Sequence, residues 1–236
     1  MTARLWNHDR QVLRNGVGLV GVDEAGRGCL AGPVFAGAVY LPEALFGKTW
    51  KRLNCPKIDD SKKLSKPERD EALDYLYRLR DEGSLRVGLG TANVKEINTH
   101  NILGATTLAM QRAIEGLDLP LPMAKMPLWA SKDSEPTPPV LIDGRPVKRL
   151  PFSHEGIVQG DGKSLAIALA SVVAKVERDR FMLSAHEKYP EYGWDRNCGY
   201  GTEIHRRAIL ESGPSPLHRP LFLRKILNPG RESLSS

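Results

Sequence analysis

Residues 17–34 read Val-Gly-Leu-Val-Gly-Val-Asp-Glu-Ala-Gly-Arg-Gly-Cys-Leu-Ala-Gly-Pro-Val. The stretch begins as a buried strand and ends in two adjacent acids, Asp23 and Glu24. Acids at the end of an apolar strand are costly to bury unless a cation lies near, and a divalent metal ion is the simplest such cation. Glycines on both sides of Arg27 leave the backbone open to a ligand. The stretch therefore predicts a metal site beside a guanidinium that can bind a phosphate or a sugar; the alternative is a tight turn with solvated acids.

The composition describes an ordinary globular protein. The chain has 236 residues, of which 41% are hydrophobic and 26% charged. A net charge of +6 and a pI of about 9.3 favour a polyanionic partner such as nucleic acid. Three distant cysteines argue against a disulfide framework or a zinc site and fit a reducing compartment. Because we find no signal-peptide core and no apolar run of membrane length, we expect a cytoplasmic protein that does not bind membranes.

Strands and helices alternate along the chain, which predicts an α/β fold. Residues 1–16 are polar and predict a flexible lead-in, followed by a single domain over 17–236 with a C-terminal helical portion from about residue 190. Ser65 and Glu68 form a capping box that starts a helix ending near Gly83. Further strands are expected over 35–41, 85–92 and 140–144, and further helices over 102–117, 163–188 and 202–211.

Three strand ends deliver carboxylates: Asp23 with Glu24, then Asp143, then Asp161. In α/β sheets the ends of strands converge on the ligand crevice. Four acids in one crevice repel each other unless cations lie among them, and carboxylates without His or Cys favour Mg²⁺ or Mn²⁺. Two such ions about 4 Å apart are the usual device for phosphodiester hydrolysis. The pattern therefore predicts a metal-dependent nuclease.

Several of these residues also fit other motifs. Asp161 is equally well placed to cap the following helix. Asp179 is a rival fourth acid, but it lies between Arg178 and Arg180, so we expect a surface ion pair there. The segment Gly162-Lys-Ser resembles the end of a phosphate-binding loop, yet the glycine required at position 157 is isoleucine. The two glycines flanking Arg27 likewise lack the third glycine of a dinucleotide-binding loop.

The order and spacing of six motifs resemble the ribonuclease HII family over residues 17–219. The motifs are Asp23-Glu-Ala-Gly-Arg-Gly with Leu-Ala-Gly-Pro-Val, Asp60-Ser-Lys-Lys-Leu-Ser, Ile142-Asp-Gly, Gly160-Asp, Ala170-Ser-Val-Val-Ala-Lys-Val-Glu-Arg-Asp and Gly199-Tyr-Gly-Thr. The sister family, ribonuclease HIII, has lysine between the two glycines and an added N-terminal domain, so Arg27 and the short lead-in argue against it. Two positions depart from the family pattern: Cys29 replaces a usual proline, and Gly162 replaces a usual serine or alanine.

This resemblance implies a ribonuclease H-like mixed sheet flanked by helices, with a C-terminal helical extension. It implies cleavage of the RNA strand of RNA–DNA hybrids and nicking 5′ of single ribonucleotides in duplex DNA, as in ribonucleotide excision repair. It also implies Mg²⁺ or Mn²⁺ as cofactor and a monomer. The residues carried over are Asp23, Glu24, Asp143 and Asp161 for metal; Gly26, Arg27 and Gly28 for the ribose 2′-hydroxyl; Tyr200 for stacking on the next deoxyribose; and Lys62, Ser171 and Lys175 for phosphates.

Two rival functions remain open at this level. A non-catalytic protein that binds hybrids would also need a basic surface, but it would not need four convergent acids, which repel phosphates in the absence of metal. A nucleotidase with a phosphate-binding loop is disfavoured by Ile157.

Overall fold

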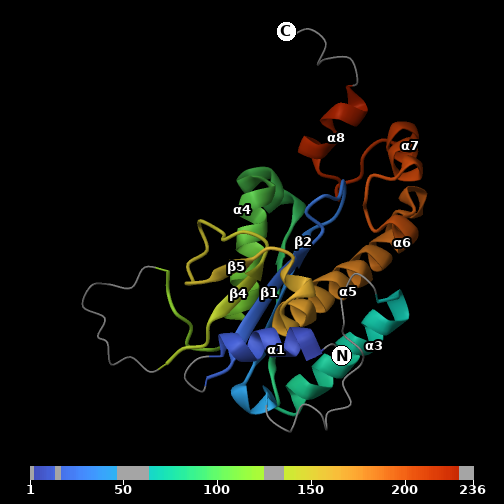
Figure 1. Cartoon of the computed structure of the whole chain (residues 1–236). Coiled ribbons are helices and arrows are strands. Elements are labelled where there is room, and N and C mark those ends of the chain that lie inside the picture. The colour runs from blue at the N-terminus through green and yellow to red at the C-terminus, as the bar shows by residue number, and fades with distance from the viewer. Residues whose placement is uncertain (1–2, 14–16, 47–63, 125–135, 229–236) are drawn as a thin grey trace.

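The computed structural model describes residues 3–13, 17–46, 64–124 and 136–228 (Figure 1). Its centre is a mixed five-stranded sheet in the order β3-β2-β1-β4-β5. Strand β1 pairs antiparallel with β2, β2 antiparallel with β3, and β1 parallel with β4, which is parallel with β5. The predicted α/β class and mixed sheet are confirmed. The strands are β1 (Leu19–Ala25), β2 (Val34–Leu41), β3 (Arg86–Ala92), β4 (Val140–Asp143) and β5 (Glu155–Ile157).

Helices cover both faces of the sheet. The long helix α5 (Leu165–Lys188) packs on one face with α1 (Ala3–Val12) and α3 (Lys66–Asp81), and α4 (Val94–Glu115) packs on the other (Figure 1). The backbone of α5 lies directly on β1, because a Cβ added at Gly21 would lie 2.1 Å from the carbonyl carbon of Ala166. This close approach brings α5 next to the acidic end of β1.

The N-terminal segment differs from the expected flexible lead-in. Residues 3–12 form α1, and its Leu5 side chain is fully buried. The buried carboxylate of Asp9 accepts a hydrogen bond of 2.9 Å from the backbone N–H of Ala166, in the first turn of α5. Helix α1 therefore adds a cap to α5, a contact between residues 157 positions apart that no local pattern encodes.

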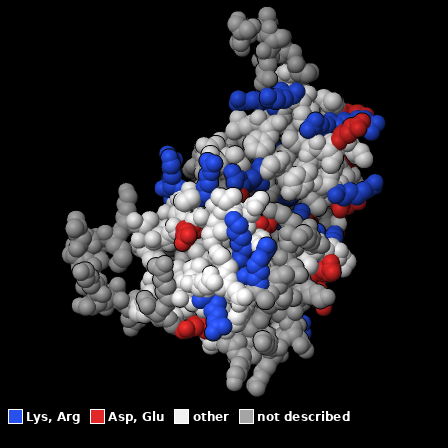
Figure 2. Space-filling model, viewed as in Figure 1, with Lys and Arg blue, Asp and Glu red and all other residues white. Residues whose placement is uncertain are grey.

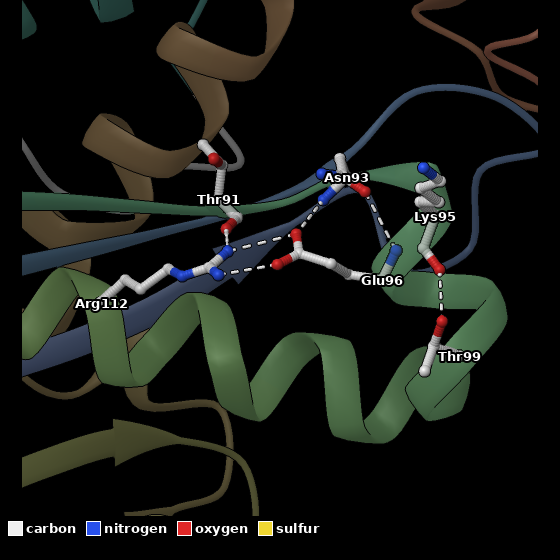
Figure 3. A network of polar contacts seen from close by, with 6 residues as sticks. All are labelled: Thr91, Asn93, Lys95, Glu96, Thr99 and Arg112. Atoms are coloured by element: carbon white, nitrogen blue, oxygen red, sulfur yellow. Dashed lines mark hydrogen bonds and ion pairs between the residues drawn. The ribbon is translucent and has the colours of Figure 1, made fainter.

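Helix α3 begins at the predicted capping box, with Ser65 as N-cap and Glu68 completing it. Helix α4 begins eight residues earlier than the predicted 102–117, because Asn93 and Glu96 form a second capping box. The helix is kinked at Asn101, whose φ of 55° and ψ of 177° are non-helical. Across the kink, Arg112 donates to both carboxylate oxygens of Glu96, at 2.7 and 3.2 Å, and to the carbonyl of Thr91 (Figure 3). This ion pair ties the two halves of α4 together.

The C-terminal part packs against the second half of α5. Three helices, α6 (Trp194–Asn197), α7 (Glu203–Ser212) and α8 (Pro220–Leu227), surround the fully buried Trp194 and join Met182 and Ala185 of α5. Short 3₁₀ turns occur at η1 (Glu43–Phe46), η2 (Gly160–Gly162) and η3 (Pro190–Tyr192). In the part of the chain described, no helix is long and apolar enough to cross a membrane.

Candidate active site

The acidic ends of β1 and β4 lie side by side. These strands are parallel neighbours, with Val22 opposite Ile142, so the next residues along them are Asp23 and Asp143. Asp23 is buried, with 6% of its surface exposed. Asp143 accepts a hydrogen bond of 2.6 Å from the backbone N–H of Gly160. The structure thus brings three of the predicted acids, Asp23, Glu24 and Asp143, together where the inner strands β1 and β4 end. We call this group of acids the carboxylate edge of the sheet.

The fourth predicted acid, Asp161, does not lie at the end of a strand as we expected. It lies in the turn η2, four residues after the last residue of β5, and is only 3% exposed; this turn packs against α5. Its neighbour Gly160 binds Asp143, so η2 joins the carboxylate edge through that contact. Asp161 does not cap the following helix either: Ser164 is the N-cap of α5.

Burial and crowding disfavour the charged forms of these acids. The pKa of Asp23 is raised well above its usual value, mainly by burial and then by the charges of Glu24 and Asp143, against a hydrogen bond from Ser171. Burial also raises the pKa of Glu24, opposed by Arg27. Each pKa unit corresponds to about 1.4 kcal/mol, so the ionised cluster is a cost to the fold without a cation.

The chemistry of the donor set fits a hard divalent cation, since it contains carboxylate oxygens only. In the residues that the structure describes, no three His, Cys, Asp or Glu side chains already surround one point at metal-binding distance. One reason is visible: Nη1 of Arg27 donates to Oε1 of Glu24 at 2.8 Å, so this carboxylate is held towards the loop. Arg27 thus engages one of the two carboxylate oxygens of Glu24.

A pH dependence of stability follows from the raised pKa values. The folded state holds protons on Asp23 and Glu24 at pH values where the unfolded chain has released them, so stability in metal-free buffer falls as pH rises above about 4. We expect the melting temperature in EDTA, measured from about pH 4 to about pH 8, to fall as pH rises, by about 3 °C for each kcal/mol lost. Thermal melts of wild type and Asp23→Asn over this range measure it. Parallel pH profiles of the two proteins would contradict the assignment to Asp23.

The loop after β1 contains the predicted Gly26-Arg27-Gly28 segment. The side chain of Arg27 is half exposed, and Gly26 is buried with a φ of +93°. A Cβ at Gly26 would lie 2.0 Å from Nε of Arg178, whereas a Cβ at Gly28 would meet no atom within 4 Å. The loop therefore presents an open backbone on one side and packs tightly on the other.

Two fully buried arginines hold this loop from behind. Arg178 of α5 donates to the carbonyls of Ala31, Pro33 and Cys198, at 2.8 to 3.2 Å. Arg219 donates to the carbonyls of Arg27, Gly32 and Pro33, at 2.9 to 3.3 Å. Neither guanidinium forms an ion pair with a described carboxylate, and burial lowers the pKa of Arg219 to about 10. Sequence reasoning missed this pair, although Arg178 falls among the apolar residues of an otherwise buried helix face.

Tyr200 lies on the α5 side of the loop and is 43% exposed. The Lys175 ammonium is 5.6 Å from its ring centre, and the Arg178 guanidinium is 5.9 Å from it. Lys175 also forms an ion pair of 2.8 Å with Asp179. Asp179 is therefore paired as expected, but with Lys175 rather than with its flanking arginines, and its side chain is only 11% exposed.

Buried histidines fix the backbone of Tyr200. His205 donates from Nδ1 to the Tyr200 carbonyl at 2.8 Å, and its Nε2 accepts from Trp194 at 3.1 Å. Nε2 of His218 lies 3.0 Å from Nε2 of His205, and Nδ1 of His218 accepts from the backbone N–H of Ser215. Burial and the neighbouring His205 lower the pKa of His218 to about 4, so the pair is neutral at physiological pH. The ring of Tyr200 thus stands on a rigid support.

Two further residues were predicted to contact phosphates, Ser171 and Lys62. Ser171 lies at the edge, where it bonds to Asp23. Lys62 lies outside the described residues.

The sequence model of the Ribonuclease HII family matches residues 20–225. The chain belongs to the ribonuclease HII family. Ribonuclease HII of Granulibacter bethesdensis is 44% identical over 222 residues, which cover 93% of this chain and 90% of that protein. Ribonuclease HII of Synechococcus elongatus is 43% identical over 215 residues, 91% of this chain and 89% of that protein. This family member is therefore a type 2 ribonuclease H, an endonuclease, and the two rival functions fall away.

Solved structures agree on the fold of ribonuclease HII. Ribonuclease H2 of Pyrococcus horikoshii superimposes with a TM-score of 0.64 at 23% identity, over 89% of this chain and 97% of that one. A Bst ribonuclease HIII in complex with Mn²⁺ gives a TM-score of 0.65 at 14% identity, over 95% of this chain and 73% of that one. The predicted ribonuclease H-like fold is confirmed.

Proposed function

We propose that this enzyme cleaves the RNA strand of RNA–DNA hybrids and nicks duplex DNA on the 5′ side of single ribonucleotides. The products are a 3′-hydroxyl and a 5′-phosphate. The proposal is carried by one observation: Asp143 lies next to Asp23 at the ends of neighbouring parallel strands, beside the loop of Arg27. Burial and the neighbouring acids disfavour the charged form of Asp23, and a bound divalent cation would offset this repulsion between carboxylates.

Asp23, Glu24, Asp143 and Asp161 would hold Mg²⁺ or Mn²⁺. A bound pair of such ions activates a water molecule and stabilises the leaving oxygen of a phosphodiester. A ribonuclease HIII with the same fold is seen with Mn²⁺. The carboxylates would orient these ions, and the hydrogen bond from Ser171 would position Asp23.

The loop and Tyr200 would select the substrate. Gly26, Arg27 and Gly28 would read the 2′-hydroxyl, the group that distinguishes RNA from DNA. Because Arg219 fixes the Arg27 carbonyl and Arg178 packs behind Gly26, the loop is preorganised for this contact. Tyr200 would stack on the next deoxyribose, and Lys175 and Lys62 would approach phosphates.

A cleavage assay tests the function. Duplex DNA with one ribonucleotide, a long RNA–DNA hybrid and an all-DNA duplex are each incubated with Mg²⁺, with Mn²⁺ and with EDTA. Nicking of the first two substrates, only with metal, and nicks that DNA ligase can seal are the expected results. Cleavage in EDTA, or ends that carry a cyclic phosphate, would contradict the metal-dependent mechanism.

The role of Arg27 gives a separate prediction. Arg27→Ala removes a charged hydrogen-bond donor, a loss of about 1.5–3 kcal/mol, so kcat/KM on a single ribonucleotide is expected to fall about 10- to 100-fold. The Mn²⁺ concentration for half-maximal rate is expected to change far less. Comparison of substrates with a ribose and with a 2′-fluoro sugar measures the selectivity, with Arg27→Lys as the charge-preserving control. An unchanged preference for ribose in Arg27→Ala would remove Arg27 from this role.

A further inference from the structure

A groove of about 600 Å³ opens beside Glu24 and Asp143 and leads away from the carboxylate edge. It lies between α4 and the segment that joins β4 to β5, on the face of the sheet opposite α5. A second hollow of about 400 Å³ shares five lining residues with it and extends across α4 to Gln111. The shared residues are His100, Asn101, Gly104, Thr107 and Arg149. Together the two hollows form one trough, which we call the α4 groove.

The walls of the α4 groove are basic. Arg145, Lys148 and Arg149 line it from the β4–β5 segment, and all three are exposed. Figure 2 shows Lys and Arg side chains gathered over α4 and this segment. The acids that line the groove are Glu24 and Asp143, both at the carboxylate end. None of the three cations forms an ion pair with an acid in the described residues, so their charge is directed at solvent.

The floor of the groove is the kink of α4. Oδ1 of Asn101 accepts from the backbone N–H groups of Leu103 and Gly104, at 2.9 and 3.2 Å, and so caps the second half of the helix. The positive end of this half-helix faces the same trough as the three cations. The positive φ of Asn101, 55°, is a strained conformation, and the Glu96–Arg112 ion pair joins the two half-helices on either side of it.

We propose that the α4 groove binds the phosphate backbone of the substrate duplex beyond the cleavage point, on the side away from Tyr200. The inference rests on the proposed function and identifies a surface that serves it. Two features select this occupant: the groove is continuous with the carboxylates where a phosphodiester is cut, and its charge complements a polyanion. An elongated trough also suits a linear polymer, whose successive phosphates meet successive cations. In this arrangement Tyr200 and the α4 groove contact the duplex on opposite faces of the sheet.

The test compares two double variants that remove the same charge. Lys148→Gln with Arg149→Gln changes the groove; Lys188→Gln with Arg196→Gln changes exposed residues outside it, near the end of α5. Each phosphate contact contributes about one unit to the slope of log affinity against log salt. We expect the groove variant to raise KM about tenfold or more, keep kcat, and make the salt slope shallower by about 2. The control variant is expected to match wild type within about twofold.

Substrate length gives a second readout. With wild type, removing base pairs on the side of the ribonucleotide that lies in the α4 groove is expected to raise KM. Removing base pairs on the Tyr200 side is not. With the groove variant, both truncations are expected to have the same small effect. If wild type cuts these duplexes but the groove and control variants share one KM and one salt slope, the groove assignment is wrong while the nuclease stands. If wild type does not cut them at all, the proposed function itself fails.

Discussion

Asp23→Asn is expected to abolish cleavage, with a fall in kcat of at least about 10³-fold, while the protein stays folded. We expect so large a fall in kcat because the carboxylates would act together, so that the loss of one removes most of their joint effect. Asn removes the negative charge but keeps the shape, and burial already disfavours that charge. We therefore expect the melting temperature in EDTA at pH 8 to be equal to or higher than that of wild type. Single-turnover cleavage and thermal melts measure the two effects.

Asp74→Asn is a suitable control, because Asp74 is an exposed acid on α3 that pairs with Arg180, away from the carboxylate edge. It is expected to retain the wild-type rate. A second readout separates metal binding from folding: added Mn²⁺ is expected to raise the melting temperature of wild type and of Asp74→Asn more than that of Asp23→Asn. Full activity in Asp23→Asn would exclude the carboxylate mechanism.

Gly26→Ala is expected to reduce cleavage at a single ribonucleotide by about 100-fold or more. A side chain at this φ of +93° is strained, and its Cβ would lie 2.0 Å from Nε of Arg178. Arg178 cannot move away freely, because its guanidinium is buried and bound to three carbonyls. The loop must therefore shift, which we expect to cost about 2 kcal/mol of stability and to misplace Arg27.

Gly28→Ala is the matched variant in the same loop. Its Cβ meets nothing within 4 Å, so we expect the melting temperature to stay within about 1 °C of wild type. Any loss of kcat/KM in Gly28→Ala then reports the approach of the substrate to the backbone, whereas the loss in Gly26→Ala combines strain and displacement. A Gly26→Ala protein that keeps wild-type stability and rate would show that the loop is not held as described.

The sequence predicted those parts of the fold that short patterns encode. The capping box at Ser65, the strand before Asp23 and the strand ending at Asp143 depend on neighbours a few residues apart, and all three are present. The proximity of Asp23 to Asp143 followed from a general property of strand ends in α/β sheets.

What the sequence did not reveal depends on distant contacts. Helix α1 is polar by composition, and its place is set by Leu5 and Asp9, which meet residues far along the chain. From the sequence alone, Arg178 and Arg219 resemble surface charges, because the carbonyls that accept their hydrogen bonds lie far away along the chain. The early start of α4 was missed because Asn101 interrupts its helical pattern, although the Asn93–Glu96 capping box was a readable signal.

Helix α5 belongs both to the core beneath the sheet and to the C-terminal cluster, so these two parts of the protein depend on each other. Its 24 residues span about 36 Å; the first half lies in the core under the sheet and the second half in the cluster around Trp194. A chain ended near residue 190 would leave Met182 and Ala185 facing water and would tend to aggregate. The C-terminal portion therefore cannot be removed or redesigned independently, because the single helix α5 sets the spacing between the carboxylate of Asp23 and the ring of Tyr200.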